Sequence, residues 1–312
     1  MKPEIILVEP MMASVEAALD AAYTVHRLDT APDRSALVAQ VGPRVRAVVT
    51  GGASGVSNAV MDACPNLGIV AINGVGTDAV DLTHAARRGV RVTNTPGVLT
   101  EDVADLAIGL IIAVSRRLIV GDRFVRAGQW PGGKLPLARK VTGKRLGIFG
   151  LGRIGRAIAE RAAGFGMSIA YTNRAVCTDV PYRCVDSLEE LARDSDILVV
   201  AASAGPENRN IVGRAVFDAL GPEGILINVA RGSIVDEAEL VAALVEGRLG
   251  AAGLDVFADE PNVPQALWSL DNVVLQPHVA SATVETRTAM ADLVLANLAA
   301  FFAGQALPTP VV

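Results

Sequence analysis

Short runs of apolar, β-branched residues alternate with helix-periodic segments along almost the whole chain. This alternation is typical of parallel sheets covered by helices. The expected strands are continuous apolar runs, as is usual for strands that are buried on both faces. They form two series: residues 4–9, 46–51, 68–73 and 90–95, then residues 145–150, 168–173, 196–202, 224–230, 251–257 and 273–278. The sequence therefore predicts an α/β protein with two doubly wound, parallel-sheet domains.

The two series meet at residues 94–105, where Pro96 and Gly97 break the chain and a hinge is expected. A length of 312 residues is enough for two domains. The last expected helix, residues 284–303, follows the second series and has a long apolar face that needs a partner. We expect this helix to cross back to the first domain. The predicted domains are residues 1–97 with 283–312, and residues 98–282.

Charge and cysteine content exclude several classes of protein. The 28 basic and 33 acidic residues nearly cancel, and no dense basic run is available to follow a phosphate backbone, so no nucleic-acid partner is expected. Cys64, Cys177 and Cys184 are odd in number and lack metal-like spacing. This pattern predicts reduced thiols in a cytoplasmic protein, with no metal site.

No segment is expected to enter a membrane. The apolar run at the N-terminus is interrupted by Glu9 and Pro10, which indicates a buried strand and not a signal peptide. The longest apolar helix candidate, residues 103–114, is shorter than the roughly 20 residues that span a bilayer. We expect it to be buried against another domain or subunit.

A glycine-rich turn opens the second series. Gly150, Gly152 and Gly155 form G-x-G-x-x-G between an apolar strand and an amphipathic helix, which is the context that dinucleotide binding requires. The three glycines would provide the tight turn, the close approach of backbone N–H groups to a pyrophosphate, and close helix–strand packing. Leu151, Arg153 and Ile154 complete the turn. The alternative is a tight strand–helix corner without a ligand.

The next strand ends without the acidic residue that usually holds an adenosine ribose. About twenty residues after the turn, Asn173 and Arg174 occupy that place. An amide and a guanidinium suit a 2′-phosphate, which a carboxylate would repel. The pair predicts a preference for NADPH. If Arg174 is only a solvated charge, NADH is the alternative cofactor.

Three later strands are followed by residues that can perform chemistry. Arg231 follows one strand, Asp255 ends the next with Glu260 in the loop beyond it, and His278 follows the last. Carboxyl ends of strands are where doubly wound folds bind ligands. Each residue alone also has a simple explanation: a surface arginine, a loop acid, a buried imidazole.

Taken together, these segments, the glycine-rich turn and the stretch NTPGVLTEDVADLAIGL resemble the D-isomer-specific 2-hydroxyacid dehydrogenase family over essentially the whole chain. The resemblance is strongest to the branch of glyoxylate/hydroxypyruvate reductases and hydroxyphenylpyruvate reductases. It implies a flavodoxin-like substrate-binding domain (residues 1–97 and 283–312) and a Rossmann NAD(P)-binding domain (residues 98–282). It also implies a homodimer that closes over a small 2-oxo acid.

The resemblance assigns roles to matching positions. Arg231 would hold the carboxylate and the carbonyl oxygen of the 2-oxo acid, His278 would donate a proton to that oxygen, and Glu260 would hydrogen-bond the other ring nitrogen. The backbone of the first domain at Gly74, Val75 and Gly76, especially the last two, would bind the substrate carboxylate, and Gly51 would line the same cleft. The cofactor would also meet Ser203, Pro206, Val229, Ala230, Asp255 and Ala280, with Asp255 on the nicotinamide amide.

Some features depart from the family pattern or have weaker implications. Ala280 stands where glycine is frequent, and Gln276 replaces a common threonine; both would adjust the pocket near the nicotinamide. Trp130 lies about where some relatives send an aromatic side chain into the neighbouring subunit's site, although an ordinary packing role is favoured here. His26 and His84 are expected to be structural.

Two rival functions share the predicted fold. A formate-dehydrogenase-like oxidoreductase would release hydride from its substrate without a paired acid, so Glu260 argues against it. A dinucleotide-sensing protein of the corepressor type would not need Arg231, Glu260 and His278 together. The predicted function is therefore reduction of small 2-oxo acids such as glyoxylate or hydroxypyruvate.

Overall fold

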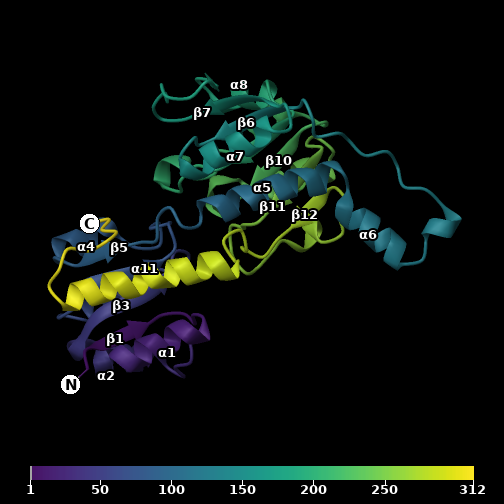
Figure 1. Cartoon of the computed structure of the whole chain (residues 1–312). Coiled ribbons are helices and arrows are strands. Elements are labelled where there is room, and N and C mark those ends of the chain that lie inside the picture. The colour runs from purple at the N-terminus through teal and green to yellow at the C-terminus, as the bar shows by residue number, and fades with distance from the viewer. Residues whose placement is uncertain (1) are drawn as a thin grey trace. The chain divides into compact units, whose positions relative to one another are not determined.

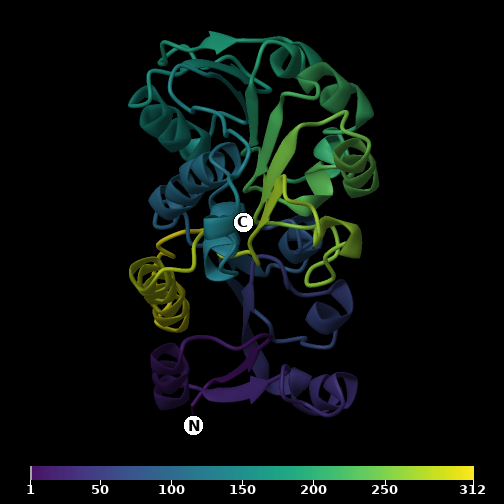
Figure 2. The same ribbon diagram turned by 90° about the vertical axis from the view of Figure 1, so that its right-hand side faces the viewer.

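The computed structural model describes residues 2–312, which divide into two compact units. The first unit is the chain up to Leu99 together with Ala282–Val312, and the second is Thr100–Ser281. Each unit contains one sheet whose described strand pairs are all parallel, with helices on both faces (Figures 1 and 2). The predicted fold class, α/β with two parallel sheets, is confirmed.

The first unit has a five-stranded sheet of order β2-β1-β3-β4-β5. This is the flavodoxin-like order, in which the chain reverses direction across the sheet between β1 and β3. Its strands are β1 Glu4–Leu7, β2 Thr24–Arg27, β3 Val45–Gly51, β4 Ile69–Asn73 and β5 Arg91–Thr93. Its helices are α1 Ala13–Ala22, α2 Arg34–Val41, α3 Asn58–Asp62, α4 Leu82–Arg87 and α11 Val284–Phe302.

The second unit has a seven-stranded sheet of order β12-β11-β10-β9-β6-β7-β8, the Rossmann order with one added strand, and it reverses between β6 and β9. Its strands are β6 Arg145–Phe149, β7 Ser168–Thr172, β8 Arg183–Cys184, β9 Ile197–Val200, β10 Ile225–Asn228, β11 Ala251–Leu254 and β12 Val273–Leu275. Its helices are α5 Thr100–Ser115, α6 Leu118–Arg126, α7 Arg153–Ala163, α8 Leu188–Arg193, α9 Arg214–Leu220 and α10 Glu237–Val245.

Burial on both faces explains the continuous apolar strands. In β1, Ile6 belongs to one core cluster of the first unit, whereas Ile5 and Leu7 belong to the cluster on the opposite face. Successive strand residues point to opposite faces, so a sheet covered on both sides needs apolar residues at every position. The second face is covered in part by α11, which contributes Val294 and Leu298.

Two strands were not predicted, and both lie at sheet edges. β2 has no buried residue and β8 is two residues long. No side chain of β2 or β8 is buried, so their sequences have no continuous apolar run to mark them. The other two edge strands, β5 and β12, keep buried residues and were predicted.

Helix α5 is buried, as expected, against elements of its own unit. It packs on β10 and β11 and against α7. The helix and the sheet are in close contact: a Cβ added to Gly253 of β11 would lie only 3.2 Å from the Cβ of Leu110 in α5. Among residues 2–312, none of the helices combines the length and apolarity needed to cross a membrane.

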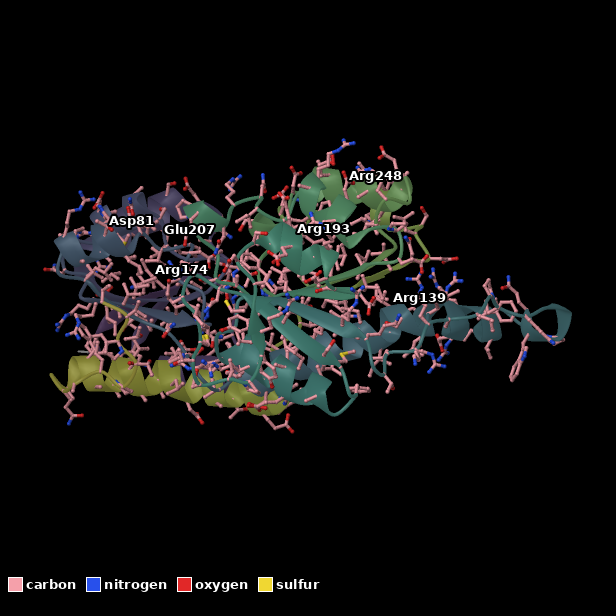
Figure 3. All side chains as sticks on the ribbon, turned by 90° about the horizontal axis from the view of Figure 1, so that it is seen from above. Asp81, Arg139, Arg174, Arg193, Glu207 and Arg248 are labelled. Atoms are coloured by element: carbon pink, nitrogen blue, oxygen red, sulfur yellow. The ribbon has the colours of Figure 1, made fainter. Side chains whose placement is uncertain are left out.

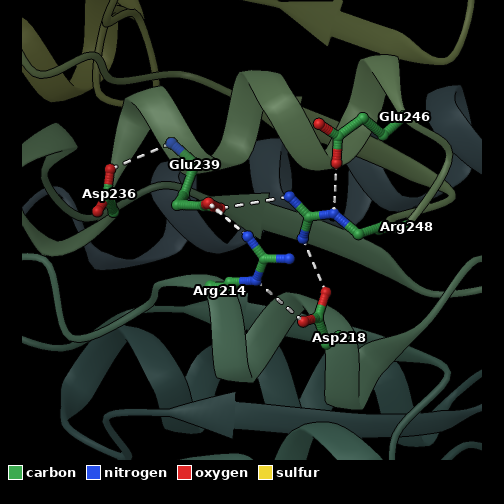
Figure 4. A network of polar contacts seen from close by, with 6 residues as sticks. All are labelled: Arg214, Asp218, Asp236, Glu239, Glu246 and Arg248. Carbon is green, nitrogen blue, oxygen red and sulfur yellow. Dashed lines mark hydrogen bonds and ion pairs between the residues drawn. The ribbon is translucent and has the colours of Figure 1, made fainter.

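A surface network ties α9 to α10 in the second unit (Figure 4). Arg248 follows α10 and donates to Asp218 of α9 and to Glu246, both at 2.7 Å, and to Glu239 at 3.3 Å. The hydrogen bonds to Glu246 and Asp218 raise the pKa of Arg248. Asp236 caps α10 by accepting from the N–H of Glu239 at 3.1 Å. These contacts fix the outer helices that follow β9 and β10.

Candidate active site

Neighbouring strands of the seven-stranded sheet carry the three predicted catalytic residues. Arg231 follows β10, Glu260 lies in the loop after β11, and His278 follows β12. The order β12-β11-β10 makes these strands adjacent, and their parallel direction brings their carboxyl ends to one edge. The structure thus brings together residues that are separated by up to 47 positions in the sequence.

Glu260 and His278 form a close pair. The Nδ1 of His278 lies 2.7 Å from Oε2 of Glu260, and the other carboxylate oxygen accepts from the N–H of Phe257 at 3.0 Å. Burial opposes ionisation of Glu260, but the bonds from His278 and Phe257 and the charge of Arg231 outweigh it and lower its pKa. With Nδ1 bound to a carboxylate, Nε2 is the ring nitrogen left to face a substrate.

The backbone at His278 is held in an unusual conformation. Its φ of 54° lies in the left-handed region, which costs energy for a residue with a side chain. Asp255 compensates, because its carbonyl accepts from the N–H of His278 at 2.8 Å and its carboxylate accepts from Val279 and Ala280 at 2.8 and 2.9 Å. Burial raises the pKa of Asp255 against the effect of these bonds. Asp255 therefore fixes the turn that aims the His278 ring.

Arg231 is positioned by the end of β10. The side chain of Asn228 accepts from the N–H of Ala230 at 3.1 Å and donates to the carbonyl of Arg231 at 3.0 Å. The guanidinium of Arg231 donates to the carbonyl of Ala230 at 2.7 Å. Gly232 allows the loop to approach the next one, since a Cβ there would collide with the backbone of Phe257. The loops that carry Arg231 and Glu260 are thus in direct contact.

The glycine-rich turn lies at the reversal point of this sheet. Gly150 follows β6 with φ of 97°, and a Cβ on it would lie 2.5 Å from the backbone of Ala202, which follows β9. A Cβ on Gly155 would collide with the carbonyl oxygen of Gly150, so α7 packs directly on the turn. By contrast, the space around Gly152 is open. An anion can therefore approach the N-terminus of α7 closely.

Asn173 and Arg174 begin a loop that is anchored to α7. Arg156 of α7 binds Asp179 of the loop with two hydrogen bonds of 2.8 and 2.9 Å. The Arg174 side chain is 83% exposed, and its nearest acid is Glu207 at 3.6 Å (Figure 3). Leu151, Arg153 and Ile154 lie on the turn and the first residues of α7, next to this loop.

The remaining predicted cofactor positions also follow strands of this sheet. Ser203 and Pro206 follow β9, and the carbonyl of Ser203 accepts from Asn208 at 2.7 Å. Val229 and Ala230 follow β10 and are nearly buried, as is Ala280 after β12.

Within residues 2–312, no group of three His, Cys, Asp or Glu side chains is placed to hold a metal ion.

The predicted substrate-binding glycines lie in the first unit. Gly51 ends β3, and Gly74, Val75 and Gly76 follow β4, which is its neighbour. The carbonyl of Gly74 accepts from Thr95 at 2.9 Å, and the carbonyl of Val75 accepts from Asn94 at 2.8 Å. These bonds fix the loop after β4.

Sequence reasoning missed the residues that support the site. Asn228 is a buried amide at the end of the strand ILIN, and Glu237 accepts from the N–H of Ala258 at 3.0 Å, which holds the Glu260 loop. A polar residue closing an apolar strand is a signal that could have singled out Asn228. The only such signal for Glu237 is its place at the start of a helix.

Open α/β sheets bind ligands outside the carboxyl ends of their strands at the reversal point, and the second sheet has its glycine turn there, with an acid–histidine pair along the same edge. Fold and site define a dinucleotide-binding α/β enzyme. Residues 108–280 match the family described as D-isomer specific 2-hydroxyacid dehydrogenase, NAD binding domain. The chain belongs to the D-isomer specific 2-hydroxyacid dehydrogenase family.

Whole-chain relatives agree with this assignment. The chain is 52% identical to hydroxyphenylpyruvate reductase of Plectranthus scutellarioides, covering 99% of this chain and 98% of that protein. It is 45% identical to 2-ketogluconate reductase of Gluconobacter oxydans, covering 100% and 99%. The NADPH-dependent glyoxylate/hydroxypyruvate reductase of Sinorhizobium meliloti, solved in complex with NADP and malonate, superposes with a TM-score of 0.94 at 43% identity, covering 100% and 97%.

Proposed function

We propose that this protein is a cytoplasmic, NADPH-preferring reductase that converts small 2-oxo acids, such as glyoxylate and hydroxypyruvate, to 2-hydroxy acids. The observation that carries the proposal is the 2.7 Å pair of His278 and Glu260 beside Arg231. The relatives named as reductases of such acids support it. The three free cysteines suit a reducing compartment.

In the proposed mechanism, Arg231 binds the carboxylate and the carbonyl oxygen of the substrate and thereby fixes the face of its carbonyl carbon. A nicotinamide dinucleotide held at the turn of Gly150, Gly152 and Gly155 would supply the hydride to that carbon. His278 donates its Nε2 proton to the carbonyl oxygen, and Glu260 stabilises the protonated ring through Nδ1. Asp255 holds the backbone turn that positions the His278 ring.

The first unit has a proposed role in substrate binding. The backbone at Val75 and Gly76 would hold the substrate carboxylate, and Gly51 and Gly74 would line the same part of the site. The bonds from Asn94 and Thr95 support this role, because they keep the Val75 loop in one conformation. The second unit would hold the dinucleotide at the turn of Gly150, Gly152 and Gly155.

The proposed NADPH preference depends on Asn173 and Arg174. Arg174 is exposed and only loosely paired with Glu207, so its guanidinium is available to bind a 2′-phosphate. The loop that carries it is anchored by Arg156 and Asp179, so the guanidinium is presented beside the glycine-rich turn. No acid occupies position 173 or 174 to bind a ribose hydroxyl group in its place.

The first test follows the loss of NADPH absorbance, and separately that of NADH, with glyoxylate, hydroxypyruvate and 4-hydroxyphenylpyruvate. We expect kcat/KM with NADPH to exceed that with NADH. In Arg174→Ala, the KM for NADPH should rise about tenfold and that for NADH should hardly change, as for a lost charge-assisted hydrogen bond. Absence of turnover with any acceptor would overturn the proposal in favour of a dinucleotide-sensing protein.

We also propose that the protein is a homodimer, and that the arm formed by residues 116–138 makes the contact. The ends of the arm meet where the N–H of Arg139 donates to the carbonyl of Ser115 at 3.0 Å. Helix α6 within the arm has no buried residue. The exposed apolar side chains of the arm are Leu118, Ile119, Val125, Trp130, Leu135 and Leu137. Trp130 is 68% exposed, so this chain alone does not provide the ordinary packing role that was favoured for it.

A further inference from the structure

An acidic side chain lies at the reversal point of the five-stranded sheet. The strand order β2-β1-β3-β4-β5 reverses between β1 and β3, which is where a sheet of this kind binds its ligand. Glu9 lies two residues beyond the end of β1, and Ser54 lies three residues beyond the end of β3. The hydroxyl group of Ser54 donates to Oε2 of Glu9 and so bridges the two loops.

The second carboxylate oxygen of Glu9 lies against Gly51. A Cβ at Gly51 would collide with the Glu9 carboxylate, so the absence of a side chain is what allows the close approach. The loop is itself rigid, because Thr50 Oγ1 donates to the carbonyl of Gly55 at 2.5 Å and the N–H of Gly55 donates to the carbonyl of Gly51 at 3.0 Å. The carboxylate is therefore held in one place.

A surface of glycine backbone connects Glu9 with the loop after β4. Gly51 and Gly52 follow on from the Glu9 carboxylate, and a Cβ on Gly74 would lie 3.2 Å from the nitrogen of Gly52. These three residues are glycines, so no side chain of theirs interrupts the surface. From β1 to β4 is two strand spacings, about 10 Å in all, a length comparable to that of a bound acid of roughly three to six carbons with its hydrogen bonds.

We propose that Glu9 selects the side chain of the substrate. Its carboxylate accepts hydrogen bonds from hydroxyl groups on carbon 3 and beyond, and its charge disfavours a second carboxylate at that end. The substrate class is thus hydroxylated monocarboxylic 2-oxo acids, from hydroxypyruvate to sugar acids. This inference depends on the proposed reductase function and on the substrate carboxylate lying at Val75 and Gly76.

The physical reason is that Glu9 is a charged hydrogen-bond acceptor, which favours substrates that carry a hydroxyl donor at the matching position. A hydrogen bond to an ionised carboxylate is stronger than one between neutral groups, and a polar site discriminates against an analogue that lacks the matching hydroxyl group. A carboxylate at the same place would be repelled by a like charge. Glu9 is only partly buried and Ser54 is exposed, so solvent reduces both effects.

The test compares substrates that differ by one group. The kcat/KM values for hydroxypyruvate, pyruvate and oxaloacetate would be measured with NADPH for the wild type and for Glu9→Ala, Glu9→Gln, Ser54→Ala and Glu4→Gln. The last is the matched control, because Glu4 is a glutamate at the amino end of the same strand, whereas Glu9 follows its carboxyl end. Melting temperatures would identify any variant that is poorly folded.

We expect Glu9→Ala to lower the hydroxypyruvate-to-pyruvate ratio about tenfold, and Glu9→Gln to raise oxaloacetate turnover about tenfold. Ser54→Ala and Glu4→Gln should leave both ratios within about threefold. Unchanged ratios in both Glu9 variants would overturn the inference. An equal loss in Ser54→Ala would also overturn it, since it would mean that the bridge only holds the loop. A wild type that reduces none of the three acids or glyoxylate would instead contradict the proposed function.

Discussion

At the scale of single residues, the chain provides its own comparison for His278. His84 pairs with Asp62 at 2.8 Å, nearly the distance that joins His278 to Glu260, but it lies on α4 in the first unit. We predict that His278→Ala lowers kcat for glyoxylate reduction by about 10²–10⁴, the usual contribution of a general acid. His84→Ala should keep kcat within about twofold. Steady-state NADPH oxidation measures both values.

The two variants also separate catalysis from folding. Similar melting temperatures with very different kcat values would support the role proposed for His278. Near-normal turnover of His278→Ala would show that another group donates the proton.

Glu260 should make stability depend on pH in a defined direction. Its pKa in the folded protein is below its ordinary value of 4.5, so its ionised form stabilises the fold above that pH, and this stabilisation is lost as the pH falls through the folded-state pKa. Glu260→Gln does not titrate. We therefore predict that it melts below the wild type at about pH 6 and that the difference shrinks towards about pH 3.5.

Thermal unfolding across this pH range tests the prediction. The control is Glu160→Gln, a change at an exposed position of α7, which should give a difference that is small at every pH. A Glu260→Gln difference that is constant with pH would mean that packing, and not ionisation of Glu260, accounts for the loss.

At the scale of elements, two glycines of the same turn should respond differently to alanine. Gly155→Ala forces a collision with the Gly150 carbonyl and should destabilise the protein by ~1–3 kcal/mol, because overpacked sites relax poorly. Gly152→Ala adds its methyl group in open space. We predict that it folds normally but weakens NADPH binding at least about tenfold by blocking the approach of the pyrophosphate.

Denaturant unfolding without cofactor, together with titration of NADPH fluorescence, distinguishes the two outcomes. If Gly152→Ala binds NADPH as tightly as the wild type, the pyrophosphate does not lie over this turn.

The apolar pattern of the sequence predicts some of these strands and helices and not others. Central strands such as β1, β6 and β10 are predictable because burial on both faces requires apolar residues at every position. The edge strands β2 and β8 escape because their side chains are only partly covered. Helix α5 is predictable as a buried helix, but its partner is not, since an apolar face does not specify what covers it.

The residues of the candidate site also differ in how far the sequence alone predicts them. Arg231, Glu260 and His278 were found because chemically active residues stood at the ends of expected strands. Asn228 was not singled out, because its side chain acts through hydrogen bonds in the turn after its own strand. Glu9 was not singled out, because its contact is with the loop after another strand. Such a contact depends on strand order, which an apolar pattern does not give.

At the scale of the whole molecule, the arm of residues 116–138 needs a partner surface. Leu137 is 99% exposed, and no residue of α6 is buried in this chain. Exposed apolar side chains gathered on one segment mark an interaction site. We predict that Leu137→Glu shifts the protein from dimer to monomer, because a carboxylate buried at an apolar contact is costly to desolvate.

Sedimentation velocity at several protein concentrations measures this shift. The matched control is Val284→Glu, which places the same charge on an apolar residue that is 73% exposed at the start of α11 in the first unit. It should remain dimeric. If both variants sediment like the wild type, or if the wild type is itself a monomer, the arm does not join two subunits, and its apolar residues must be explained in another way.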